Sequence, residues 1–106
     1  MAMIMSTADS VPGREIAETM GLATGSTVRA RHVGRDVLAG LKQIVGGEIG
    51  AYEKLLQESR TQALARLEEA AAAMGADAVV ALRLTTSAIA QGSAEVLAYG
   101  TAVKLQ

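Results

Sequence analysis

The amino-acid sequence predicts an α+β fold, in which a small antiparallel sheet packs on one long helix and a short helix accompanies them. Between Ile49 and Met74, apolar residues recur with the spacing of one helix face. After Gly75 the pattern changes to the alternation that is typical of strands. At 106 residues the chain has room for a single core, so we expect one domain over residues 1–106.

The N-terminal third is predicted to be extended. The segment from Met3 to Thr7 has the composition of a short strand, and Pro12-Gly13 is the pair favoured at the centre of a type II turn. From Arg14 to His32 the chain favours strand, but Gly21 and Gly25 interrupt it. We therefore expect two strand pieces that are joined by a bend or a bulge.

Two helices are expected next. Asp36 is suited to cap a short helix, whose apolar residues end at Gly46-Gly47. The long helix follows, and Gly75 is predicted to end it as the left-handed residue after the last turn. At about 1.5 Å per residue, this helix is expected to be close to 40 Å long.

Two strands are predicted at the C-terminal end, with a turn at Gln91-Gly92-Ser93. In the first strand, Val80, Leu82 and Leu84 are expected to share one face of the sheet. The last strand has two apolar faces, a small one from Ala94 to Ala102 and a larger one that contains Leu97, Tyr99, Val103 and Leu105. Because both are apolar, we expect the helix to cover the small face and another subunit to meet the larger one.

Composition favours self-association and excludes several kinds of site. The chain has no Trp, Phe or Cys, and alanine supplies much of its apolar content, so a monomer would have a thin core. The absence of Cys excludes disulfides, zinc–thiolate sites and iron–sulfur clusters. With 10 basic and 11 acidic residues, the net charge of -1 attracts neither nucleic acid nor an anionic membrane. We expect a cytoplasmic homo-oligomer with no membrane segment.

Four short segments of the chain are informative together: Arg35-Asp36, "IVGGEIGAYEKLL" from Ile44, "GADAVVAL" from Gly75 and "AYGTAV" from Ala98. They resemble the YbjQ-like family, an uncharacterised family that is labelled heavy-metal-binding. The resemblance implies a compact α+β subunit in a ring, a pentamer, without an established activity. A ligand or interface site is expected among the residues that match the family pattern, which are Arg35, Asp36, Gly46, Gly47, Tyr52, Glu53 and Arg60.

Each candidate site has a structural interpretation beside the functional one. Gly46-Gly47 before a helix could surround an anion with backbone N–H groups, but the following Glu48 would repel a phosphate, so we favour a hinge. Tyr52 belongs to the apolar stripe of the helix. Glu53 and Arg60 are two turns apart and do not touch directly, so Arg60 is expected to pair with Asp36 or with a neighbouring subunit rather than to form a ligand site.

A metal ion is the one cofactor that the residues leave open. His32 is the single histidine, so a metal site would need carboxylates or a ring that collects one His32 from each subunit. Met1, Met3 and Met5 alternate, and a strand would align their thioethers for a soft ion such as Cu(I), although Met is also a common core residue.

Catalysis and nucleic-acid binding are the less favoured functions. One histidine, no cysteine and no G-x-S-x-G leave no catalytic triad, so we expect no enzyme. Arg29, Arg31 and Arg35 form a short basic stretch without an aromatic platform nearby. The favoured function is a ring-forming assembly domain of unknown ligand, and the alternative is a metal-ion or small-anion binding module at subunit interfaces.

Overall fold

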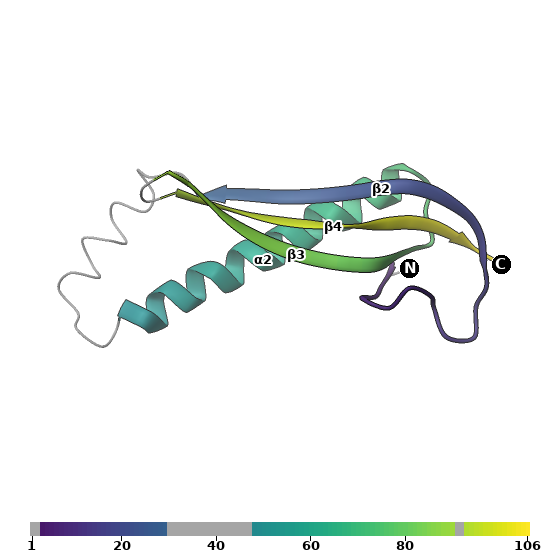
Figure 1. Cartoon of the computed structure of the whole chain (residues 1–106), viewed down its shortest axis with the longest axis horizontal. Helices are drawn as coiled ribbons and strands as arrows, with labels where there is room; N and C mark the ends of the chain where they lie inside the picture. Colours follow the sequence, from purple (N-terminus) through teal and green to yellow (C-terminus); the bar gives the residue numbers. More distant parts are fainter. Residues whose placement is uncertain (1–2, 30–47, 91–92) are drawn as a thin grey trace.

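The computed structural model describes residues 3–29, 48–90 and 93–106, which form an α+β fold with a helix packed on a four-stranded sheet (Figure 1). The helix is α2 (Glu48–Ala73), and the strands are β1 (Ile4–Met5), β2 (Ile16–Arg29), β3 (Ala78–Ala90) and β4 (Ser93–Leu105). The order in the sheet is β1-β3-β4-β2. Because β1 pairs parallel to β3, the sheet is mixed, and the prediction of a wholly antiparallel sheet was wrong. The short helix predicted after Asp36 lies outside the described residues.

The long helix is confirmed, with 26 residues and a length of about 39 Å at 1.5 Å per residue. Its buried face is a line of small and apolar residues four apart, which are Ser59, Ala63, Leu67 and Ala71. The helix ends as predicted at Gly75, whose φ is 84°. The N–H of Ala76 donates to the carbonyl of Ala71 and the N–H of Gly75 to that of Ala72, which is the Schellman arrangement.

The predicted type II turn is also present, but β2 is one strand rather than two pieces. Gly13 has φ 77°, and the N–H of Arg14 donates to the Val11 carbonyl at 3.1 Å. Register shifts next to Glu18 and before Gly21 mark two bulges early in β2. Gly21, with φ 128°, takes the left-handed backbone that the second bulge needs.

Strand β2 continues through Gly25. A glycine is needed at this position because the helix comes very close to the strand there. A Cβ added at this glycine would overlap the backbone N of Leu67 and the carbonyl oxygen of Ala63. The guanidinium of Arg66 also donates from the helix to the Ser26 carbonyl at 2.6 Å. The helix therefore lies mainly over β2 and β4, and much less over β3.

The predicted faces of β3 were wrong, because the strand contains a bulge. Val80 pairs with Thr101 but Arg83 pairs with Tyr99, and Ala81 between them has φ 53°. The bulge places Val79 and Leu82 on the helix side and Val80 on the other side. Val80 and Leu82 therefore do not share a face, because the extra residue reverses the alternation.

The segment that follows β1 continues along the edge of β3 at this bulge. The N–H of Ala81 donates to the Ala8 carbonyl at 2.8 Å, and the N–H of Leu82 donates to the Ser6 carbonyl at 3.0 Å. Farther along the same segment, Val11 packs on the side of the sheet away from the helix, where it covers Val80 and Val103.

The core therefore has two parts on opposite faces of the sheet. The larger part lies between helix and sheet, and its buried members are Ala23, Ala63, Leu67, Ala71, Val79, Leu82, Val96, Ala98 and Ala102. The small face of β4 meets the helix, as predicted. The second part is a small cluster under the N-terminal segment, made of Val11, Ala78, Val80, Val103 and Leu105.

Candidate functional site

Most of the residues that match the family pattern lie outside the described part of the chain. These are Arg35, Asp36, Gly46 and Gly47, together with the metal candidate His32. The choice between an anion-binding loop and a hinge at the glycine pair therefore stays a prediction.

The other three matching residues lie on α2, near its N-terminal end. Tyr52 is in the helix, with its side chain outside the described set, whereas Glu53 and Arg60 are both exposed. They are two helical turns apart, too far for direct contact along the helix. Neither forms an ion pair with another residue of the described part. We predicted that Arg60 pairs with Asp36 or with a neighbouring subunit, and Asp36 lies outside the described residues, so this pairing stays a prediction.

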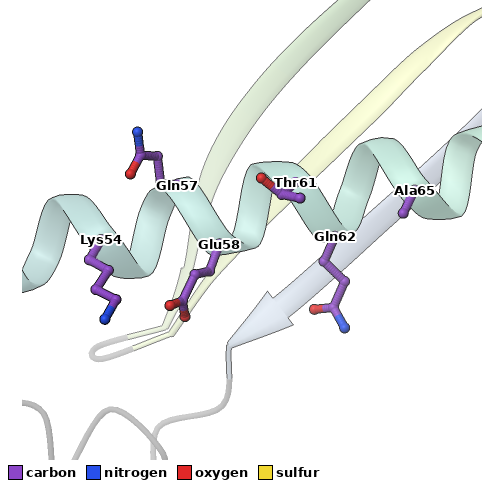
Figure 2. Close-up of a pocket in the computed structure, with 6 residues that line it drawn as sticks. All are labelled: Lys54, Gln57, Glu58, Thr61, Gln62 and Ala65. Atoms are coloured by element: carbon purple, nitrogen blue, oxygen red, sulfur yellow. The ribbon is translucent and has the colours of Figure 1, made fainter.

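A shallow polar hollow follows the same half of α2 (Figure 2). Its volume is about 580 Å³, and its lining residues are Lys54, Gln57, Glu58, Thr61, Gln62 and Ala65. Lys54, Glu58 and Gln62 point to the same side of the helix. One lysine beside one glutamate gives the hollow no strong charge of either sign, so it offers no selective site for an ion.

The side of the sheet away from the helix is only partly covered, and we call its uncovered part the open sheet face. Strand register places three apolar side chains on it, Leu22, Leu97 and Tyr99, together with the polar residues Thr24, Ser26, Arg83, Thr85, Ser87, Glu95 and Thr101. The N-terminal segment covers the neighbouring end of this side, where Val103 and Leu105 are buried. The open sheet face is therefore a mixed surface, with a few apolar side chains next to the apolar cluster that the N-terminal segment covers.

The open sheet face exposes two large apolar side chains near its middle. Leu22 is 69% exposed, the largest value among the exposed large hydrophobic residues, and Tyr99 is 37% exposed. Leu22 pairs with Thr101, and Tyr99 pairs with Thr24 on one side and Arg83 on the other. Leu97 and Tyr99 were predicted on this face, but Leu22 was missed. The sequence signal that could have placed Leu22 on this face is its alternation with the small residue Ala23, which is buried.

Two buried hydroxyl groups were also not predicted from the sequence. Ser59 is 1% exposed, and its Oγ donates to the Leu55 carbonyl at 2.9 Å. Thr27 is 3% exposed, and its Oγ1 has no hydrogen-bond partner within the described residues. Thr27 pairs with Val96, so its side chain lies on the helix face of the sheet.

The described residues do not gather the ligands of a metal ion. Within residues 3–29, 48–90 and 93–106, no group of three or more His, Cys, Asp or Glu side chains lies close enough to hold one. Asp77 has a structural role, because its Oδ2 accepts a hydrogen bond from the N–H of Leu105 at 2.9 Å. Met3 and Met5 pack partly buried against the main core, as expected of core methionines.

The fold and this surface define a class of small α+β domain, with a long helix on one side of the sheet and a partly uncovered face that exposes Leu22 and Tyr99 on the other. The chain belongs to the YbjQ-like family, whose model is described as "Putative heavy-metal-binding" and matches residues 3–106. The resemblance predicted from the sequence is thereby confirmed. His32, the single histidine, lies outside the described residues, and these bring together no group of three His, Cys, Asp or Glu ligands.

Relatives from bacteria and archaea match nearly the full chain. A UPF0145 protein of Vibrio campbellii is 57% identical over 103 residues, which are 97% of this chain and 99% of the relative. A UPF0145 protein of the archaeon Methanosarcina acetivorans is 52% identical, with 97% of both chains covered. Neither name states an activity.

A solved structure supports the fold alone. A protein with unknown function of the DUF74 family, from Pediococcus pentosaceus, superposes with a TM-score of 0.59 at 18% identity, covering 98% of both chains. Among the described residues, no helix has the length and apolar character needed to cross a membrane.

Proposed function

We propose that this chain is a non-enzymatic assembly domain that forms a homo-oligomeric ring in the cytoplasm and has no catalytic site of its own. The observation that carries the proposal is the open sheet face, where Leu22 and Tyr99 are exposed beside an otherwise covered apolar surface. A second copy that buried both side chains would gain about 25 cal/mol for each Å² of apolar area removed from water. The pentamer implied by the family resemblance is the ring that we expect.

The edges of the sheet support a ring rather than a two-fold dimer. β2 has no strand on its outer side among the described residues, and β3 has none from Arg83 onward, beyond its contacts with the N-terminal segment. Exposed edges readily pair with other chains. Because these two edges differ, pairing one with the other is head-to-tail, and repeated head-to-tail contacts form a ring when the rotation between subunits closes, or a filament when it does not.

Native mass spectrometry of untagged protein tests the proposal directly. We expect a single multiple of the chain mass, with five copies as the expected number. The Tyr99→Asp variant should dissociate to monomer or aggregate, because it places a charge in the apolar contact. Gln106→Asp adds the same charge at an exposed terminal residue and should leave the oligomer intact. A wild-type monomer, or an unchanged oligomer in Tyr99→Asp, would contradict the proposal.

The second candidate function is a metal-ion or small-anion site at the subunit interfaces. The family description favours it, and ring symmetry would bring together one His32 from each subunit. A stoichiometric extra mass on the intact oligomer would support this candidate. His32→Ala should then lower the bound metal, and an unchanged metal content would exclude His32 as a ligand.

A further inference from the structure

The sulfur of this chain is concentrated around one end of the helix. The sequence contains five methionines and no cysteine. Four of them, Met3, Met5, Met20 and Met74, pack half-buried against the core between helix and sheet. Any oxidant that reacts with sulfur in this protein must therefore react with a thioether, because no thiol competes for it.

Met20 and Met74 form an interlocked pair between β2 and the end of α2. The Cε of Met74 lies 3.8 Å from the position that a Cβ would occupy on Gly21, the residue after Met20. Reciprocally, the Cε of Met20 lies 3.9 Å from the same position on Gly75, the residue after Met74. Each methyl group is thus the atom nearest to the Cβ position of the glycine that follows the other methionine, at ordinary contact distance.

Both glycines hold special backbone conformations beside this packing. Gly21 has φ 128° at the β2 bulge, and Gly75 has φ 84° at the helix end. The two methionines therefore connect the bulge of the strand to the terminus of the helix. Both side chains are also partly exposed, so a small oxidant in water can reach them.

We propose that Met20 and Met74 are an oxidation-sensitive latch, whose reactant is a peroxide such as H2O2. Each thioether sulfur attacks one peroxide oxygen, the O–O bond breaks, and that oxygen stays on sulfur as a sulfoxide. The proton of the transferred hydroxyl passes to the departing oxygen, which leaves as water. Sulfur loses the two electrons that reduce the peroxide. This latch does not depend on the proposed assembly.

Oxidation should loosen the end of the helix. A sulfoxide is polar, and it needs a hydrogen-bond partner wherever it is shielded from water. The Met20 and Met74 side chains pack partly buried against the core, and their methyl groups border the Cβ positions of Gly75 and Gly21. The oxidised side chains must therefore move outward, and the helix end then loses its packing on β2.

The test treats the wild-type protein with H2O2, locates the added oxygen by peptide mass spectrometry and measures the thermal midpoint. We expect one oxygen on each of Met20 and Met74, and a fall in Tm of about 4 °C or more. Methionine sulfoxide reductases should restore the original Tm. The Met20→Leu/Met74→Leu variant conserves volume and should keep its Tm in peroxide, whereas the matched Met3→Leu/Met5→Leu variant should still lose stability.

Two results would overturn the latch. One is sulfoxide at Met20 and Met74 with an unchanged Tm. The other is loss of stability that follows oxidation of Met3 and Met5 while Met20 and Met74 remain thioethers. If the double leucine variant does not fold, partial oxidation of the wild type decides the question, because the unfolded fraction must then increase with the sulfoxide at these two residues.

Discussion

Gly25 is the residue at which the helix and the sheet touch most closely. The atoms nearest to its missing side chain belong to the backbone of Ala63, Arg66 and Leu67, and a backbone cannot rotate away. Sequence reasoning interpreted this glycine as an interruption of the strand. A glycine required by close approach and a glycine that ends a strand look the same in a single sequence.

Gly25→Ala should therefore destabilise the fold by about 3 kcal/mol, the upper end of overpacking costs. Gly100→Ala is the matched comparison, because the nearest atom there is the side-chain Cγ1 of Val79, at 2.5 Å. A side chain can change rotamer, so we expect the smaller loss for Gly100→Ala. Urea unfolding of both variants checks the order, and the reverse order would contradict this interpretation of the contact.

Thr27 offers a second prediction at the level of one residue. Its hydroxyl is buried without a partner in the described residues, and such a group costs about 1–3 kcal/mol. Thr27→Val replaces the hydroxyl by a methyl group of similar size, so the free energy of unfolding should rise by about 1 kcal/mol. Thr27→Ser keeps the hydroxyl, loses the methyl group and should be less stable. A loss of stability in Thr27→Val would indicate that the hydroxyl has a partner in the assembled protein.

Among the elements, α2 was the most predictable and β3 the least. The helix has a long apolar period and a glycine that ends it, and both signals are local. The bulge at Ala81 has no such signal, because alanine is a rare residue at φ 53° and the N-terminal segment holds it by hydrogen bonds from far along the chain. Parallel pairing of β1 with β3 is equally non-local, since two residues carry little strand preference.

The helix end gives a prediction at this scale. Gly75→Ala places a Cβ at φ 84° and should cost about 1–2 kcal/mol, because left-handed backbone is unfavourable for alanine. Gly75→Asn should cost less, since asparagine tolerates this conformation better. Circular dichroism at increasing temperature measures both losses. Equal stability of the alanine variant and the wild type would show that the Schellman end contributes little.

At the scale of the whole molecule, the sequence predicted only part of the open sheet face. Alternation in β4 placed Leu97 and Tyr99 together on the larger face, as the register confirms. Leu22 was missed although it alternates with Ala23, whereas the cover over Val103 could not be predicted, because it depends on how the N-terminal segment packs on the sheet. The candidate residues drawn from the family pattern stay largely untested, since most lie outside the described residues.

Assembly also predicts how stability depends on concentration. If subunits fold and associate together, the thermal midpoint of the wild type should rise as the protein concentration is increased. Tyr99→Asp, if it remains folded as a monomer, should show a midpoint that does not change with concentration. Differential scanning calorimetry over a hundredfold range of concentration makes the comparison. A midpoint of the wild type that is independent of concentration would contradict a coupled assembly.

The strand order β1-β3-β4-β2 has a consequence for how the protein folds while it is synthesised on the ribosome. β2 is synthesised early, yet its neighbour among the described strands is β4, the last element to leave the exit tunnel. Until then α2 has little of the platform on which it later packs, and both edges of β2 are unpaired. A pause in translation after β3 should therefore leave nascent chains that are open to protease and to chaperones.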